Sequence, residues 1–208
     1  MCSKRGMDDT TTRRFAECSR RRRRPAWVTA VAGAVAAAAV VAVVGLGAGL
    51  IAAAEPPLGE VRLVDHAELM ATVASHRGRV VVLDCWSTSC PPCLREFPGL
   101  VALARRHPDV VCLSLSFDYE GIGRPEDALP RVRTFLEQVA AGPVHNLLSR
   151  EESDVMARRL DIASVPAVFV WGPDGALVRR FDDDSAARQK RPFTYADVEA
   201  EVRRLRQP

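Results

Sequence analysis

Two cysteines separated by two residues, in the run Cys90-Pro91-Pro92-Cys93, are the residues of this chain best suited to chemistry. A pair at this spacing either supplies two zinc ligands or forms a small disulfide that opens and closes in redox reactions. A structural zinc site needs four protein ligands, yet the chain has no second Cys-x-x-Cys and no histidines three to five residues apart. The spacing therefore favours a redox pair, and we predict no metal site. Each histidine stands alone and is expected at the surface, namely His66, His76, His107 and His145.

The segments around the two cysteines favour reactivity at Cys90. The run Val80–Leu83 predicts a strand buried on both faces, and a helix is predicted from Pro91 to Arg106. A thiol at a helix N-terminus has a lowered pKa, because the free N–H groups there stabilise the thiolate. We therefore expect Cys90 to attack a disulfide and Cys93 to resolve the mixed disulfide that forms. The alternative is a static structural disulfide.

The segment 81–103, VVLDCWSTSCPPCLREFPGLVAL, resembles the active-site segment of thioredoxin-like proteins. The similarity is greatest to the membrane-anchored TlpA/ResA type, which often continues the cysteine pair as Cys-x-x-Cys-x-x-Glu-x-Pro, here with Glu96 and Pro98. The resemblance implies a thioredoxin fold, thiol–disulfide oxidoreductase activity, protein disulfides as substrates and no bound cofactor. It also makes Glu96 a candidate catalytic residue.

The same resemblance assigns expected roles to four further residues. Asp84 stands where the family keeps a buried acid that moves a proton to or from the second cysteine, although a simple strand-end residue is the alternative. Trp86 matches the tryptophan beneath the active site and is a candidate substrate contact, with a packing role as the alternative. Val165 and Pro166 resemble the cis-proline loop, in which the backbone at Val165 pairs with an extended substrate. An ordinary trans proline is the alternative there.

The N-terminal segment carries a membrane signal. Residues 1–25 hold nine Lys or Arg and three Asp or Glu, and five consecutive arginines at 20–24 precede an uncharged stretch over 27–54. About 20 apolar residues suffice to cross a bilayer, and basic residues stay on the cytoplasmic side. We predict a single-pass anchor in the cell (inner) membrane, with the C-terminal domain on the extracytoplasmic (periplasmic) side. Cleavage after residues 52–54, a twin-arginine signal and a buried core helix are the alternatives.

The chain is thus expected to have four parts. They are a cytoplasmic basic tail at 1–25, a transmembrane signal-anchor helix at 26–54, a linker at 55–60 and a thioredoxin-like domain at 61–208. From residue 55 onward, twenty Lys or Arg face twenty-three Asp or Glu. This mildly acidic balance argues against a nucleic-acid partner, which needs basic residues clustered on the folded domain.

Strands and helices alternate along the predicted domain. Strands are predicted at 61–64, 79–85, 110–117, 167–171 and 176–181, with a short extended piece at 147–148. Helices are predicted at 65–75, 91–106, 127–141, 149–160 and 194–205. Early strands separated by helices should be parallel, whereas the last two, joined by Gly172-Pro173-Asp174-Gly175, should form an antiparallel hairpin. The fold class is therefore α/β, with a mixed central sheet flanked by helices.

The remaining cysteines and one acidic run are predicted to be structural. Cys85 and Cys112 lie in apolar strands and are expected in the core, whereas Cys2 and Cys18 are expected as free cytoplasmic thiols. The run 182–184, three aspartates, is expected to be a solvated loop.

The leading functional hypothesis is reduction of disulfides in exported proteins, including apocytochrome c before haem attachment. No nucleotide or flavin motif is present, so electrons would arrive from a transmembrane donor. A thiol oxidase or isomerase on the same fold is an alternative, as is a non-catalytic copper chaperone. A peroxidase is disfavoured, because Thr88 stands only two residues before Cys90. Ser89 and Ala167 replace residues common in the family, which leaves substrate preference open.

Overall fold

The computed structural model describes residues 60–182, 186–187 and 190–207. The predicted basic tail and membrane anchor, and all of the predicted linker except Glu60, lie outside these residues. Among the helices that are described, none is both long enough and apolar enough to cross a membrane.

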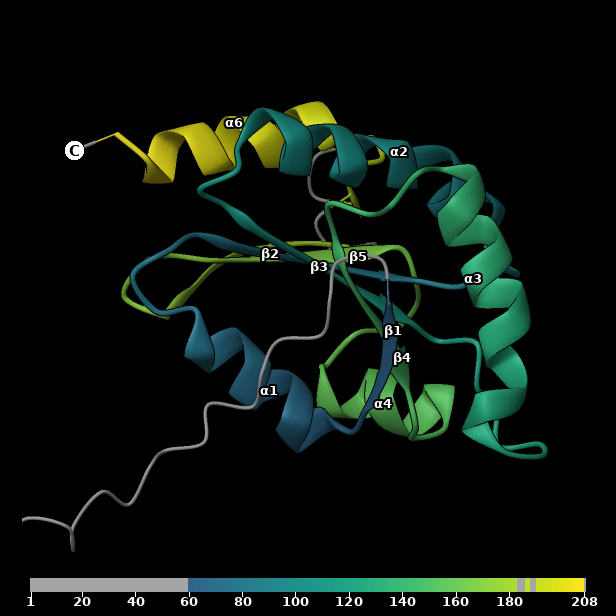
Figure 1. Ribbon diagram of the computed structural model, residues 1–208. Helices are drawn as coiled ribbons and strands as arrows, with labels where there is room; N and C mark the ends of the chain where they lie inside the picture. Colours follow the sequence, from purple (N-terminus) through teal and green to yellow (C-terminus); the bar gives the residue numbers. More distant parts are fainter. Residues whose placement is uncertain (1–59, 183–185, 188–189, 208) are drawn as a thin grey trace, which may run out of the picture. The chain divides into compact units, whose positions relative to one another are not determined.

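A six-stranded mixed sheet forms the centre of the domain (Figure 1). In chain order its strands are β1 (Val61–Val64), β2 (Val81–Trp86), β3 (Val111–Ser116), β4 (His145–Ser149), β5 (Ala167–Trp171) and β6 (Leu177–Phe181). Across the sheet the order is β1-β4-β3-β2-β5-β6. The first four strands in this order are parallel, whereas β5 is antiparallel to β2 and β6 is antiparallel to β5. The predicted mixed sheet and terminal hairpin are confirmed.

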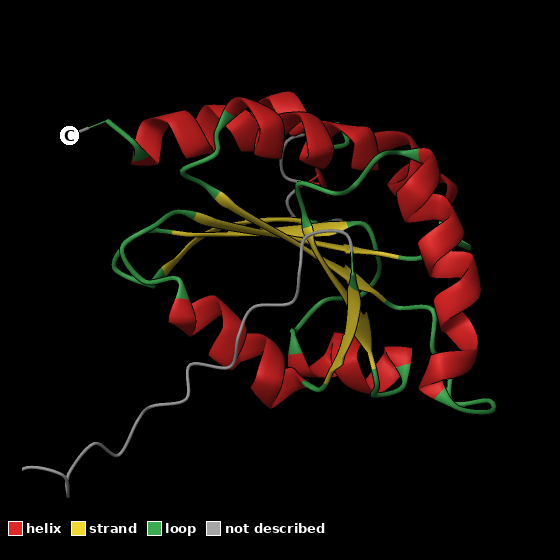
Figure 2. Ribbon diagram, viewed as in Figure 1, coloured by secondary structure: helices red, strands yellow, loops and turns green. Residues whose placement is uncertain are grey.

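Helices cover both faces of this sheet (Figures 1 and 2). They are α1 (His66–Ser75), α2 (Pro91–Arg106), the 3-10 helix η1 (Pro125–Ala128), α3 (Leu129–Gln138), α4 (Ser153–Arg159) and α6 (Tyr195–Leu205). One hydrophobic cluster joins α2, α3 and α6 to the sheet, and a second joins α1 and α4 to the opposite face. Parallel strands with helical crossovers, and an antiparallel hairpin beside β2, make this a thioredoxin-like α/β fold.

Strand β4 is longer than the sequence predicted and occupies an interior position. It lies between β1 and β3 and is parallel to both, whereas only 147–148 were predicted to be extended. The polar Asn146 obscures the strand pattern in the sequence. In the structure this amide is buried but satisfied, since it accepts from Ser114 Oγ at 2.9 Å and donates to the carbonyl oxygens of Ala141 and Val144. A buried polar group is tolerated when it has such partners.

The helix boundaries follow their capping residues. Asp65 accepts a hydrogen bond from the Glu68 amide at 2.8 Å, and the Glu68 carboxylate accepts from the Asp65 amide at 2.9 Å. This capping box begins α1 where predicted, and Thr194 with Asp197 begins α6 in the same way. The predicted helix at 127–141 is instead η1 followed by the shorter α3. The helix predicted at 149–160 is also shorter in the structure, where it is α4, because β4 extends through Ser149.

Two surface predictions are wrong. His76 is only 6% exposed, and its ring lies against that of His145 with the centroids 5.7 Å apart. Asp182 is 5% exposed and forms an ion pair with Arg180 at 2.5 Å, so it is not part of a solvated loop. Residues 183 and 184 lie outside the described residues. Cys85 and Cys112 are free and buried, as predicted.

Candidate active site

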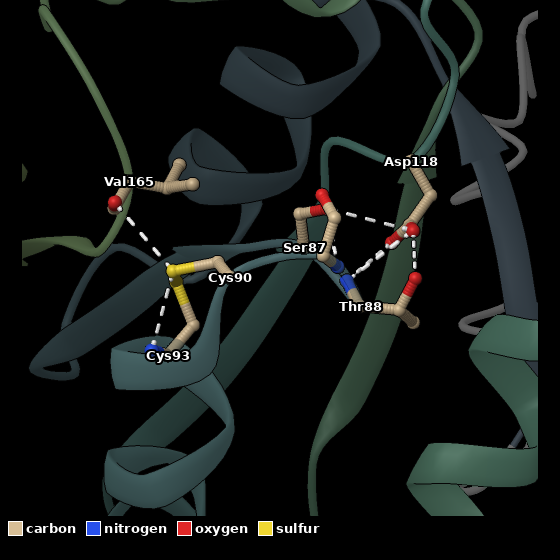
Figure 3. The surroundings of a disulfide bond; sticks show 7 residues. Ser87, Thr88, Cys90, Cys93, Asp118 and Val165 are labelled. Carbon is tan, nitrogen blue, oxygen red and sulfur yellow. Dashed lines mark hydrogen bonds between the residues drawn. A yellow bond between two sulfur atoms is a disulfide. The ribbon is translucent and has the colours of Figure 1, made fainter.

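Cys90 and Cys93 form a disulfide at the N-terminus of α2 (Figure 3). Cys90 is the N-cap residue, and its Sγ accepts a hydrogen bond from the Cys93 amide at 3.3 Å. Pro91 and Pro92 occupy the first helical turn, where no amide proton is needed for the helical ladder. Cys90 is partly exposed, whereas Cys93 is 2% exposed. An external thiol or disulfide therefore reaches the sulfur of Cys90 and not that of Cys93.

The loop before β5 lies directly against this disulfide. The Val165-Pro166 peptide bond is cis, as the resemblance implied. The Val165 carbonyl oxygen lies 3.6 Å from Cys90 Sγ (Figure 3). Val165 and Pro166 are both partly exposed. The backbone of a bound segment could thus run along Val165 within reach of the reactive sulfur.

Asp84 is a buried carboxyl on β2, 3% exposed. Successive strand residues point to opposite faces of a sheet, and Val82 and Trp86 belong to the core that packs under α2. Asp84 therefore faces the same side as Cys93. Burial raises the pKa of Asp84 from 3.8 to about 7, a hydrogen bond from Tyr195 opposes this rise, and the charge of Glu96 adds to it. A carboxyl that titrates near neutral pH is suited to exchanging a proton with a thiol.

Glu96 and Trp86 occupy supporting positions. Glu96 is half-buried on α2 and acts on the pKa of Asp84 through its charge. Trp86 is completely buried, and its ring packs on Phe97 at 5.0 Å and on Phe135 at 4.8 Å between centroids. Of the two roles expected for Trp86, the structure favours packing over a substrate contact, because α2 and α3 both cover the ring.

Asp118 belongs to a site that the sequence did not reveal. It is 3% exposed and follows the last residue of β3 by two positions. Its carboxylate accepts hydrogen bonds from the amide and hydroxyl of Thr88 and from the Ser116 hydroxyl at 2.6 Å (Figure 3 shows the Thr88 contacts). Arg131 on α3 donates to it at 3.2 Å. Asp118 therefore ties the loop that precedes Cys90 to the segment between β3 and β4.

The sequence held one signal for this network. Asp118 follows a buried parallel strand that neighbours β2, so both strands end at the same edge of the sheet. A polar side chain at that edge often faces the functional loop. The arginine that completes the network comes from α3, and its position depends on tertiary packing.

A cleft of about 190 Å³ opens beside the disulfide. It is bounded by the loop after β2, the end of β3, helix α4 and the segment that leads to the cis proline. Ser89 and Val165 line the cleft, and the Val165 carbonyl oxygen lies 3.6 Å from Cys90 Sγ, while Phe117 and Ile162 contribute apolar surface. The cleft has room for a side chain of a segment bound along Val165.

Replacing Asp118 with alanine should destabilise the domain by about 1–3 kcal/mol, because buried donors lose their acceptor. Denaturant unfolding of the oxidised protein measures this change. Glu126→Ala, at an exposed position of η1, is the control and should change stability by less than about 0.5 kcal/mol. Equal stability of the two variants would contradict the structural role of Asp118.

The chain is similar to several solved structures at low sequence identity. No family model and no curated protein matches the chain. Among solved structures, it is similar to a secreted Mycobacterium tuberculosis disulfide oxidoreductase described as homologous to E. coli DsbE (20% identity, 64% of this chain and 86% of that chain, TM-score 0.49). It is also similar to M. tuberculosis DsbF (19%, 63% and 84%, TM-score 0.45). A third is a thioredoxin-family thiol:disulfide interchange protein from Chlorobium tepidum (18%, 64% and 83%, TM-score 0.46).

At these identities the function of the chain has to be inferred from its own site. A disulfide with one accessible sulfur at a helix N-terminus, a cis proline against it and a buried acid beneath α2 give this thioredoxin-like domain the geometry that thiol–disulfide exchange requires.

Proposed function

We propose that the chain is a membrane-anchored thiol–disulfide oxidoreductase of the TlpA/ResA type that reduces disulfides in exported proteins. The observation that carries the proposal is the asymmetry of the disulfide: Cys90 is accessible beside the cis proline, whereas Cys93 is buried one helical turn further on. A structural disulfide needs no exposed sulfur, but an exchanging one does.

The geometry supports a two-step reaction. The Cys90 thiolate attacks one sulfur of a substrate disulfide, which forms a Cys90–substrate bond and releases the other substrate sulfur as a thiolate that takes up a proton. Cys93 then loses its proton and attacks Cys90, which forms the Cys90–Cys93 disulfide and releases the second substrate thiolate. Overall the substrate disulfide gains two electrons and two protons, and the protein dithiol loses them.

The proposed direction is reduction, and the reduction potential tests it. Equilibration of the full chain with glutathione redox buffers, followed by thiol trapping, measures the potential of the Cys90–Cys93 pair. A value near about −270 mV is expected for a reductase, whereas a value near about −120 mV would favour the oxidase alternative. If the pair does not exchange with glutathione at all, the proposed activity is wrong.

The proposed location rests on the sequence of the N-terminal segment. Arginines at 20–24 before the uncharged stretch 27–54 favour a retained anchor, with the exchange site outside the cytoplasm. A transmembrane electron donor would then keep Cys90 and Cys93 reduced, and apocytochrome c is one substrate of suitable chemistry. A C-terminal alkaline phosphatase fusion tests the orientation, since this reporter folds only where disulfides form. An inactive fusion that is made in full would contradict it.

A further inference from the structure

Tyr195 reaches the buried acid from a distant part of the chain. It is the first residue of α6, it is 6% exposed, and its hydroxyl donates a hydrogen bond to Asp84 Oδ2. The two residues are 111 positions apart in the sequence. Because α6 packs beside α2, the phenol reaches the carboxyl through the same core that holds Cys93.

The adjacent helix is shaped to admit this tyrosine. Gly99 lies in the interior of α2, where glycine costs about 1 kcal/mol relative to alanine. A Cβ atom at Gly99 would lie 2.6 Å from Cδ2 of the Tyr195 ring and closer still to Cγ. Real Cβ atoms do not approach neighbours this closely. Glycine at this position therefore gives the tyrosine ring the space that it occupies.

Among the described residues, the other groups around Asp84 are one acid, two buried thiols and an apolar side chain. Glu96 on α2 raises the pKa of Asp84 through its negative charge. Cys85 on the same strand and Cys112 on β3 are buried thiols whose own pKa values are raised, so both stay neutral. On β5, the residue paired with Asp84 is the apolar Val168. Arg79 acts through its charge on Cys112, whereas Tyr195 donates a hydrogen bond to the Asp84 carboxylate itself.

We propose that Tyr195 is the positioning residue for Asp84: it fixes the orientation of the carboxyl and stabilises its ionised form, so that Asp84 can accept the proton of Cys93. This inference deepens the proposed function and rests on it. The proton of the Cys93 thiol passes to Asp84, the Cys93 sulfur attacks Cys90, and the Cys90–substrate bond breaks. The departing substrate thiolate then takes up a proton. Tyr195 keeps its own proton throughout, because burial holds the pKa of the phenol well above its ordinary value.

Tyr195→Phe in the full chain tests the inference, since phenylalanine keeps the ring and removes only the hydroxyl. The titration of the Asp84 carboxyl is followed by carbon-13 NMR in the reduced protein. Loss of a hydrogen bond to a charged group should move the midpoint upward by about one pH unit. Tyr119→Phe is the matched control, because the chain has two tyrosines. An Asp84 midpoint that is the same in Tyr195→Phe and in the control would overturn the inference.

A second variant acts from the opposite side of the contact. Gly99→Ala leaves both partners intact but places a Cβ where the ring lies, so it should also raise the Asp84 midpoint. The rate at which Cys93 resolves the mixed disulfide should fall at low pH, and the midpoint of this fall should lie at higher pH in Tyr195→Phe than in the unmodified chain. In a chain that already carries Asp84→Asn, Tyr195→Phe should not change the resolution rate further. An additional loss of rate in the double variant would contradict the pairing of Tyr195 with Asp84.

These readouts separate the inference from the function on which it rests. If Tyr195→Phe shifts the Asp84 titration in a protein that exchanges no disulfides, the Asp84–Tyr195 pairing stands and the proposed function is wrong. If exchange is normal and the Asp84 midpoint does not move in either variant, the proposed function stands and the role of Tyr195 is wrong.

Discussion

Cys90→Ser is expected to abolish thiol–disulfide exchange. Cys90 carries the accessible sulfur, held at the N-terminus of α2 and 3.6 Å from the Val165 carbonyl oxygen, whereas Cys93 is 2% exposed. A serine hydroxyl does not form the mixed disulfide, so the first step has no nucleophile. The rate at which the reduced full chain cleaves a fluorescent disulfide peptide should fall to that of the peptide without protein.

Cys112→Ala is the matched control for this loss. Cys112 is a free thiol buried in β3, and its pKa is raised to about 12 by burial, so it contributes no thiolate near neutral pH. The control should retain the exchange rate of the unmodified chain. Exchange by Cys90→Ser at a rate comparable to that of Cys112→Ala would mean that a different sulfur carries the reaction.

Asp84→Asn is expected to change how stability depends on pH. Burial raises the pKa of Asp84 from 3.8 to about 7 in the folded protein. Between these values the folded protein holds a proton that the unfolded chain has lost, so stability falls as pH rises. This loss of folding stability is absent below the pKa of Asp84 in the unfolded chain and complete above about 7. A pKa difference of about 3 between the two states corresponds to about 4 kcal/mol. Asparagine does not titrate and should remove this loss.

Denaturant unfolding at about pH 4 and about pH 8 measures the effect, since the change between the two pH values isolates the titrating group. At each pH, the free energy of unfolding of Asp84→Asn is compared with that of the unmodified oxidised chain. This difference should be about 4 kcal/mol more favourable to the variant at the higher pH than at the lower pH. Asp109→Asn, at an exposed residue paired with Arg206, is the control and should show little of this gain. Parallel pH profiles for the unmodified chain and Asp84→Asn would contradict a raised pKa at Asp84.

The local elements of the domain were largely predictable from the sequence. Asp65 and Thr194 are capping residues, and they set the starts of α1 and α6 without help from distant contacts. The apolar run at 80–83, with three valines, and the two prolines after Cys90 likewise predicted β2 and α2. The cysteine pair and the cis proline were each expected from a short motif, although the two motifs lie 75 residues apart in the sequence.

Features that depend on contacts between distant segments could not be predicted in this way. Asn146 looks unsuited to a buried strand until Ser114 and two carbonyl groups satisfy its amide. The hydrogen bond of Tyr195 to Asp84 depends on the packing of α6 beside α2, and that of Arg131 to Asp118 on the docking of α3. Such pairings leave no periodic or spacing signal, because each is set by the tertiary fold.

Mass spectrometry of a trapped mixed disulfide tests the central claim most directly. The full chain carrying Cys2→Ser and Cys18→Ser, with Cys93→Ser added, is reduced and then exposed to a disulfide peptide. We predict a stable one-to-one adduct on Cys90, because the resolving sulfur is absent and the thiols of Cys85 and Cys112 are buried. In the same background, Cys90→Ser with Cys93 intact should give no adduct. Adduct formation at Cys93 with none at Cys90 would contradict the account.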